Sequence, residues 1–121
     1  MSYICSCKQI LFMLEKFRTE TASRSVRGTI RGSILRHVMR HAIEKGLGIE
    51  CNTNRGHTPL PDAEILTLYR RLGGEIITLG SDAHTADYLG CAIAERQELL
   101  RSCGFRYFTT FQKGKPDFRP L

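Results

Sequence analysis

The chain has 121 residues, of which 41% are hydrophobic and 25% are charged, a composition typical of one soluble globular domain with a modest core. Its apolar runs are too short to span a membrane and its first residues lack the order of a secretory signal, so we predict a cytoplasmic protein. The net charge is +6, and residues 1–32 hold six basic against two acidic side chains.

The basic N-terminal quarter, residues 1–32, is predicted to be a segment separate from the domain that follows it. Apolar residues recur at helical spacing over residues 7–18, which predicts a short amphipathic helix. Residues 19–32 lose that periodicity, and we interpret them as a loop and a domain boundary. Phe17 is the one aromatic residue in the stretch that holds the arginines. A solvated or disordered connector is therefore favoured over a nucleic-acid-binding segment.

The cysteines are odd in number and show no repeated spacing: Cys5, Cys7, Cys51, Cys91 and Cys103. One residue separates the first two cysteines, which is less than the two residues of the usual Cys-x-x-Cys metal-binding pair. The sequence has no second closely spaced pair of cysteines to complete a metal site. We therefore expect free, mostly buried thiols in a reducing compartment.

From residue 33 onward, helix and strand patterns alternate. The first predicted helix is capped by Ser33 and ends at Gly46, and a strand over 48–51 follows it. Asp62 caps the second helix, which leads to a strand over 75–79. The third helix covers about 89–103 and ends at Gly104, and it is followed by a strand over 105–111 and a tail that begins with the turn 113–116. This order is typical of parallel βαβ units, in which ligands gather at the carboxyl ends of the strands.

Two polar loops, over residues 52–57 and 81–85, follow predicted strands and should therefore open on the same rim of the sheet. Asp82 and His84 stand two residues apart in the second loop, so their side chains should project from the same side. Carboxylate oxygen and imidazole nitrogen together suit zinc, manganese or iron better than calcium. The alternative interpretation is that Asp82 caps a turn while His84 lies on the surface.

Other polar residues leave two interpretations open. Arg55 has the planar fork of donors that binds phosphate, or it is an exposed loop residue. Glu50 lies inside a strand, where its carboxylate must be paired, hydrogen-bonded or turned to a polar cavity. His57 is either a substrate contact or an ordinary loop histidine. His37 and His41 have the i, i+4 spacing that chelates metals, and we interpret them as residues of a helix face.

Several blocks of the sequence resemble the C-terminal part of the histidinol-phosphatases of the PHP (polymerase and histidinol phosphatase) superfamily. They are Gly-Ile-Glu-Cys-Asn-Thr-Asn at 48–54, the stretch 66–85 with Ile-Thr-Leu-Gly-Ser-Asp-Ala-His, and Gly-Phe-Arg-Tyr-Phe at 104–108. The blocks keep the family's order and spacing over residues 33–121. The resemblance implies an incomplete α/β fold, the C-terminal part of a PHP-type (β/α)7 barrel with parallel strands and flanking helices.

The resemblance also implies an activity, the metal-dependent hydrolysis of L-histidinol phosphate to L-histidinol and phosphate in histidine biosynthesis. The family holds up to three divalent ions, which activate water and neutralise charge on the transferring phosphoryl group. Asp82 and His84 match the family's last motif and would be catalytic metal ligands. Arg55 would contact the substrate phosphate, and Asn52 would support substrate binding, with Glu50 beside it.

The start of the family's domain has no counterpart here. The family opens with a His-x-His motif, whereas this chain contains no histidine before Arg36. We therefore predict the last two to three βα units of a barrel over 33–121, behind a divergent segment 1–32. Two ligands rarely hold a metal ion, so we expect weak metal binding and little turnover from the chain alone. The alternatives are a non-catalytic barrel fragment that associates with another chain, a PHP enzyme for another phosphate ester, and a basic binding module.

Overall fold

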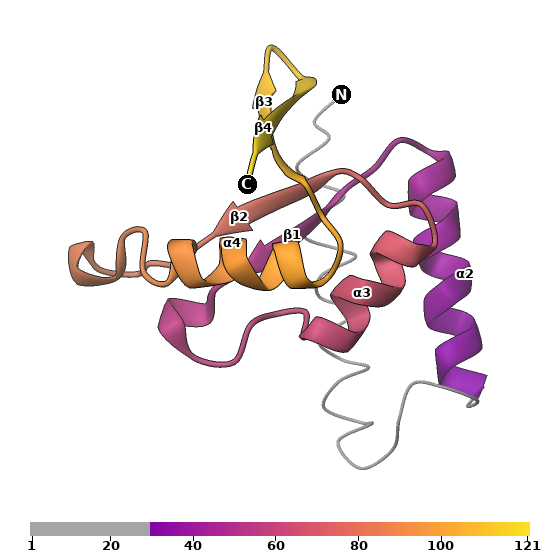
Figure 1. Ribbon diagram of the computed structural model, residues 1–121, viewed down its shortest axis with the longest axis horizontal. Coiled ribbons are helices and arrows are strands. Elements are labelled where there is room, and N and C mark those ends of the chain that lie inside the picture. Colours follow the sequence, from indigo (N-terminus) through magenta and orange to yellow (C-terminus); the bar gives the residue numbers. More distant parts are fainter. Residues whose placement is uncertain (1–29) are drawn as a thin grey trace.

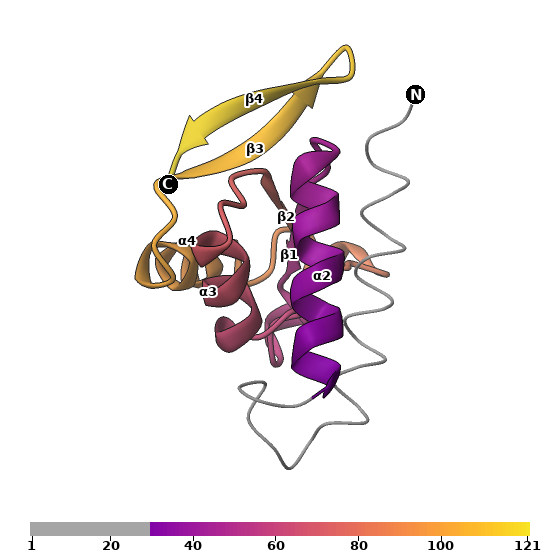
Figure 2. The same ribbon diagram turned by 90° about the vertical axis from the view of Figure 1, so that its right-hand side faces the viewer.

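Helices and short strands alternate along residues 30–121, the part of the chain that the computed structural model describes (Figures 1 and 2). The elements are α2 (Ile30–Glu44), β1 (Ile49–Asn52), the 3-10 turn η1 (Asn54–Gly56), α3 (Ala63–Arg71), β2 (Ile77–Gly80), the 3-10 turn η2 (Ala86–Tyr88), α4 (Ile93–Ser102), β3 (Tyr107–Gln112) and β4 (Lys115–Pro120). Across this range no helix is long and apolar enough to cross a membrane. The predicted helix over 7–18 lies outside the described residues.

The centre of the fold is the unit β1–α3–β2. β1 and β2 pair in parallel, in register from Ile49 opposite Ile77 to Asn52 opposite Gly80. A parallel pair requires a crossover, and α3 supplies it. The prediction of a parallel βαβ unit in an α/β protein is confirmed here.

The two faces of this small sheet differ in chemistry. Ile49, Cys51 and Ile77 are at most 1% exposed and belong to the main core. The alternating residues Glu50 and Asn52 are half-buried and point to the opposite face, since successive strand residues face opposite ways. The core cluster comprises Leu35, Met39, Ala42, Ile49, Cys51, Ile65, Leu66, Tyr69, Ile77, Leu100, Cys103 and Phe105.

Helix α2 begins earlier than predicted. The helix starts at Ile30, so Ser33 lies within it and does not cap it, and the last three residues of the predicted loop 19–32 are helical. Glycine at position 32 indicated a loop, because glycine costs about 1 kcal/mol in a helix interior. The buried positions of α2 nevertheless recur at helical spacing from that glycine: Gly32, Leu35, Met39 and Ala42. Packing of this face outweighs the local preference.

The predicted helix ends at Asp62 and Gly46 are confirmed. The Asp62 side chain accepts a hydrogen bond from the Ile65 backbone N–H (3.1 Å), which satisfies a free donor of the first turn of α3. Gly46 adopts φ +69° just after α2. The following Leu47 N–H donates to the carbonyl oxygen of Ala42 (2.9 Å), a typical glycine C-cap.

Helix α4 begins at Ile93, four residues later than predicted. Residues 89–92 form turns instead, because Gly90 (φ +71°) and Ala92 (φ +58°) both have left-handed backbones. The apolar character of Leu89 favoured a helix, but its side chain is 79% exposed. The apolar pattern alone therefore set the predicted start too early.

The end of the chain differs most from prediction. β3 does not continue the parallel sheet but pairs in an antiparallel hairpin with β4, and the predicted tail is that second strand. The hairpin stands above the β1–β2 sheet (Figure 2). A buried hydrogen bond links it to β2, in which the Ile77 backbone N–H donates to the hydroxyl oxygen of Thr109 (3.2 Å). Lys113-Gly114, both with positive φ, make the reversal that the hairpin needs.

The three described cysteines are free, and two of them, Cys51 and Cys103, are buried. This agrees with the predicted free thiols; Cys5 and Cys7 lie outside the described residues. Burial raises the pKa of the Cys51 thiol from 9.0 to about 12, although the nearby charge of Arg96 acts in the opposite direction. Cys51 is therefore a neutral thiol at physiological pH and an inert part of the core.

We expect iodoacetamide at pH 8 to modify half-buried Cys91 well before Cys51, with Cys51 reacting only after denaturation in urea, as mapped by mass spectrometry of the peptides. The neutral thiol stabilises the fold fully below pH 9, and this contribution is lost as the pH rises toward 12, because the unfolded chain ionises first. Cys51→Ala should show a shallower loss of stability over that range. Rapid labelling of Cys51 in the folded chain would contradict the burial.

Candidate metal and phosphate site

The loops after β1 and β2 lie side by side at the carboxyl ends of the two strands (Figure 1). The Thr53 backbone N–H donates to the carbonyl oxygen of Gly80 (2.7 Å), which extends the parallel pairing by one residue. The Arg55 backbone N–H donates to the carbonyl oxygen of Ser81 (3.2 Å). The structure thus brings both predicted loops together on one rim.

Asp82 and His84 form a close pair on this rim. The Asp82 Oδ1 and His84 Nε2 atoms are 3.4 Å apart, and the two side chains are 41% and 68% exposed. Asp82, the second residue after β2, has a left-handed backbone (φ 55°). This turn lets the carboxylate and the imidazole project toward each other from the loop.

The geometry of the pair fits two ligands of one metal ion. Ligand atoms about 2.0–2.1 Å from a tetrahedral zinc ion lie about 3.3 Å from each other. The separation of 3.4 Å between Asp82 Oδ1 and His84 Nε2 matches that value. Within residues 30–121, however, no group of three or more His, Cys, Asp or Glu side chains is placed to hold a metal. The described part of the chain therefore supplies two candidate metal ligands, fewer than the three or four protein ligands of a typical zinc site.

Asn52 shapes the loop beside this pair. Its Oδ1 accepts a hydrogen bond from the Asn54 backbone N–H (2.7 Å), and its Nδ2 donates to Glu50 Oε1 (3.4 Å). A side-chain amide has two N–H donors, so one remains for another acceptor. The Glu50 carboxylate lies over Gly80, where an added Cβ would stand 2.9 Å from Oε2. Glu50 thus has the polar surroundings that its place in a strand requires.

Arg55 lies in η1 with an unusual backbone and a buried side-chain Nε atom. Its φ of 54° and ψ of 34° place it in the left-handed region. Its Nε atom is buried and, within residues 30–121, has no hydrogen-bond partner. A buried guanidinium N–H without an acceptor costs free energy, which an oxyanion at this position would recover.

Arg96 is a site residue that the sequence pattern does not reveal. It lies on α4, and its Nη2 donates to the carbonyl oxygen of His57 (2.5 Å). Thr53 makes a second link to the start of this helix, where its hydroxyl donates to the carbonyl oxygen of Cys91 (2.7 Å). Together these contacts hold the loop that carries Arg55 against α4. An arginine in a helix is too common to be singled out from sequence alone.

The remaining histidines lie away from the pair or point outward. His57 is exposed in the loop after η1, and it contributes its backbone carbonyl to the contact with Arg96. His37 and His41 are exposed on α2. Their position agrees with the interpretation as residues of a helix face.

Comparison with known proteins supplies a context for this rim. No family model matches the chain. A probable histidinol-phosphatase of Thermotoga maritima is 41% identical over 49 residues, which cover 40% of this chain and 21% of that protein. The histidinol-phosphatase of Lactococcus lactis is 32% identical over 76 residues, 60% of this chain and 28% of that protein.

The fold agrees with the sequence matches. The crystal structure of the Lactococcus lactis histidinol phosphate phosphatase, complexed with zinc, L-histidinol and phosphate, matches 69% of this chain and 33% of that chain, with a TM-score of 0.58 and 31% identity. The chain is related to the histidinol-phosphatases. The predicted resemblance is thereby confirmed over part of the chain, which spans between a fifth and a third of the length of these relatives.

The histidinol-phosphatase relationship bears on the interpretation of the rim. The helices and the parallel strand pair of this chain form an α/β unit, in agreement with the predicted fold class, and the chain matches part of the solved structure at 31% identity. The solved relative carries zinc and phosphate, which are the two kinds of ligand that the Asp82–His84 pair and Arg55 suit chemically.

Proposed function

We propose that residues 33–121 are the C-terminal part of a PHP-type (β/α)7 barrel and serve a cytoplasmic histidinol-phosphatase, a metal-dependent phosphoric monoester hydrolase. The observation that carries this proposal is the 3.4 Å separation of Asp82 Oδ1 and His84 Nε2 on the rim of the sheet, in a chain whose fold matches part of a histidinol phosphate phosphatase complexed with zinc. Residues 1–32 form a separate segment in this proposal.

Each rim residue has a role in the proposed site. Asp82 and His84 would hold a divalent metal ion, which we propose to be zinc, manganese or iron, within a site of up to three ions. When bound, such ions supply an activated water and neutralise charge on the transferring phosphoryl group. Arg55 binds the phosphate oxygens of histidinol phosphate through its guanidinium group, whose Nε atom is buried. Asn52 donates its remaining amide N–H to the substrate.

The supporting contacts explain how these side chains are oriented before substrate arrives. The hydrogen bond between Arg55 and Ser81 fixes the phosphate-binding loop relative to the metal-binding loop. Arg96 fixes the same loop to α4 through the carbonyl oxygen of His57. Substrate positioning of this kind reduces the entropy that must be lost in reaching the transition state.

A chimera tests the proposal. In it, residues 33–121 replace the matching segment of the Lactococcus lactis histidinol-phosphatase, whose remaining chain supplies the other parts of the domain. We expect the chimera to release phosphate from histidinol phosphate in a zinc- or manganese-dependent manner, and the isolated 121-residue chain to show little or no turnover. A well-folded chimera with no metal-dependent activity would contradict the proposal.

A further inference from the structure

A cavity lies at the opposite end of β2 from the Asp82–His84 pair. It has a volume of about 320 Å³ and is lined by Arg70, Glu75, Phe105, Arg106, Tyr107 and Phe118. Glu75 precedes β2, whereas the metal pair follows it, so the two sites occupy different ends of the strand. Its volume is at the lower end of the range for small-molecule pockets.

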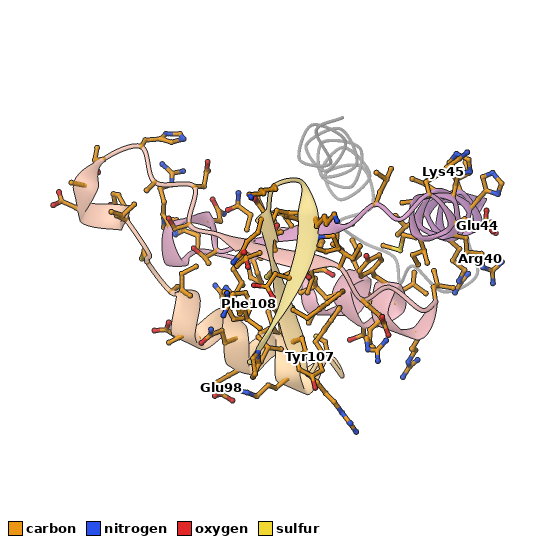
Figure 3. All side chains as sticks on the ribbon, turned by 90° about the horizontal axis from the view of Figure 1, so that it is seen from above. Arg40, Glu44, Lys45, Glu98, Tyr107 and Phe108 are labelled. Carbon is orange, nitrogen blue, oxygen red and sulfur yellow. The ribbon has the colours of Figure 1, made fainter. Side chains whose placement is uncertain are left out.

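The hairpin forms the aromatic wall of this cavity. Tyr107 and Thr109 lie on one face of β3, and Phe118 lies directly opposite Thr109 on β4. Because Thr109 is buried and contacts β2, this face of the hairpin points toward the body of the molecule. Tyr107 and Phe118 nevertheless stay 49% and 42% exposed. Figure 3 shows Tyr107 at the end of the hairpin where β3 begins.

Phe105 provides the floor. Its side chain is 4% exposed, and its ring stacks on Tyr69 with the centroids 6.3 Å apart. A flat ligand that entered the cavity would thus meet a rigid apolar floor and two partly exposed rings. Aromatic rings in such a setting favour another ring, through offset or edge-to-face contacts.

The rim of the cavity carries charges of both signs. The Arg70 Nε donates to the carbonyl oxygen of Gly104 (3.1 Å), which fixes the side chain at the end of α3 while its terminal nitrogens remain available. The side chains of Arg106 and Glu75 form no ion pair with any residue in the described range 30–121. Two guanidinium groups and one carboxylate therefore surround an aromatic cavity.

We propose that this cavity binds an aromatic α-amino acid, with its ring between Tyr107 and Phe118, its carboxylate on the two arginines and its ammonium group on Glu75. The charges distinguish this ligand from a simple aromatic acid, which would place its anion near Glu75 without a cation to compensate it. A purely apolar ligand would leave all three charges unused. The proposal concerns a separate site and does not depend on the phosphatase activity.

The test is a titration of the ¹⁵N-labelled 121-residue chain with L-phenylalanine, followed by NMR. We expect chemical-shift changes confined to residues 70–76, 105–107 and 116–120. Phenethylamine lacks the carboxylate, 3-phenylpropionate lacks the ammonium group and L-leucine lacks the ring. Each should bind about tenfold more weakly or worse, since each loses a charge-assisted or aromatic contact.

Matched variants assign the contacts. Arg106→Met and Glu75→Gln should each weaken L-phenylalanine binding about tenfold, because both side chains are exposed and can be changed without loss of a structural contact. Arg71→Met, on α3 but outside the cavity, should bind as the unchanged chain does. The proposal is overturned if L-phenylalanine produces no shifts, if the three analogues bind equally well, or if the shifts centre on residues 81–85. None of these results bears on metal binding by Asp82 and His84.

Discussion

Replacing Tyr69 with alanine is expected to abolish cooperative folding of residues 30–121. The Tyr69 side chain is 1% exposed, stacks on Phe105 and contacts Gly74 so closely that an added Cβ there would lie 2.4 Å from the ring. Truncation of a large buried aromatic side chain costs about 3–5 kcal/mol. The free energy of unfolding of a domain with a core of this size is little larger than that cost. Thermal denaturation followed by circular dichroism should show no transition.

Tyr69→Phe is the matched control for this prediction. It keeps the ring and removes the hydrogen bond from the hydroxyl to the carbonyl oxygen of Ile76 (2.9 Å). Loss of that bond should cost about 1 kcal/mol and leave a folded protein with a lowered melting temperature. If the two variants were equally stable, the ring would not be the centre of the core.

Asp82→Ala or His84→Ala, introduced into the chimera described above, should reduce hydrolysis of histidinol phosphate on the order of 100-fold or more. Each substitution removes one of the two donor atoms that lie 3.4 Å apart. The remaining donor cannot fix the metal ion where the phosphoryl group is transferred. The measurement is phosphate release at saturating zinc or manganese.

His57→Ala provides the comparison. Its imidazole is exposed, and its contribution to the loop is the backbone carbonyl that accepts from Arg96. The chimera with this substitution should therefore keep most of its activity. Equal losses in the His57 and His84 variants would indicate a general disturbance of the rim, and unchanged activity in the Asp82 and His84 variants would exclude them as metal ligands.

The central unit could be predicted from the sequence because its signals are local. The strand around Ile49 alternates buried with half-buried polar residues, the strand around Ile77 belongs to a short apolar run, and Asp62 is a strong helix cap. Parallel topology then places the carboxyl ends of both strands on one rim. This topology predicts that Arg55 lies close to the loop that holds Asp82. The hydrogen bond between the Arg55 and Ser81 backbones joins the two loops as expected.

Other features depend on contacts between distant parts of the chain. The pairing partner of β3 is decided by the reversal at Lys113-Gly114 and by the bond from Ile77 to Thr109, 32 residues away. The start of α2 is decided by packing at Gly32, against the local preference of glycine. The contact of Arg96 with the loop at His57 joins residues 39 positions apart. Sequence periodicity within a short window cannot predict contacts between residues so far apart in the chain.

The central claim is that Asp82 and His84 together hold a metal ion. It is tested most directly by titrating Mn²⁺ into the ¹⁵N-labelled chain and mapping paramagnetic line broadening, since manganese favours carboxylate and imidazole over thiol ligands. We predict weak binding, with broadening centred on residues 81–85 and extending to Arg55, and its loss in Asp82→Ala and His84→Ala. Broadening centred on His37 and His41, or unchanged in both variants, would contradict the claim.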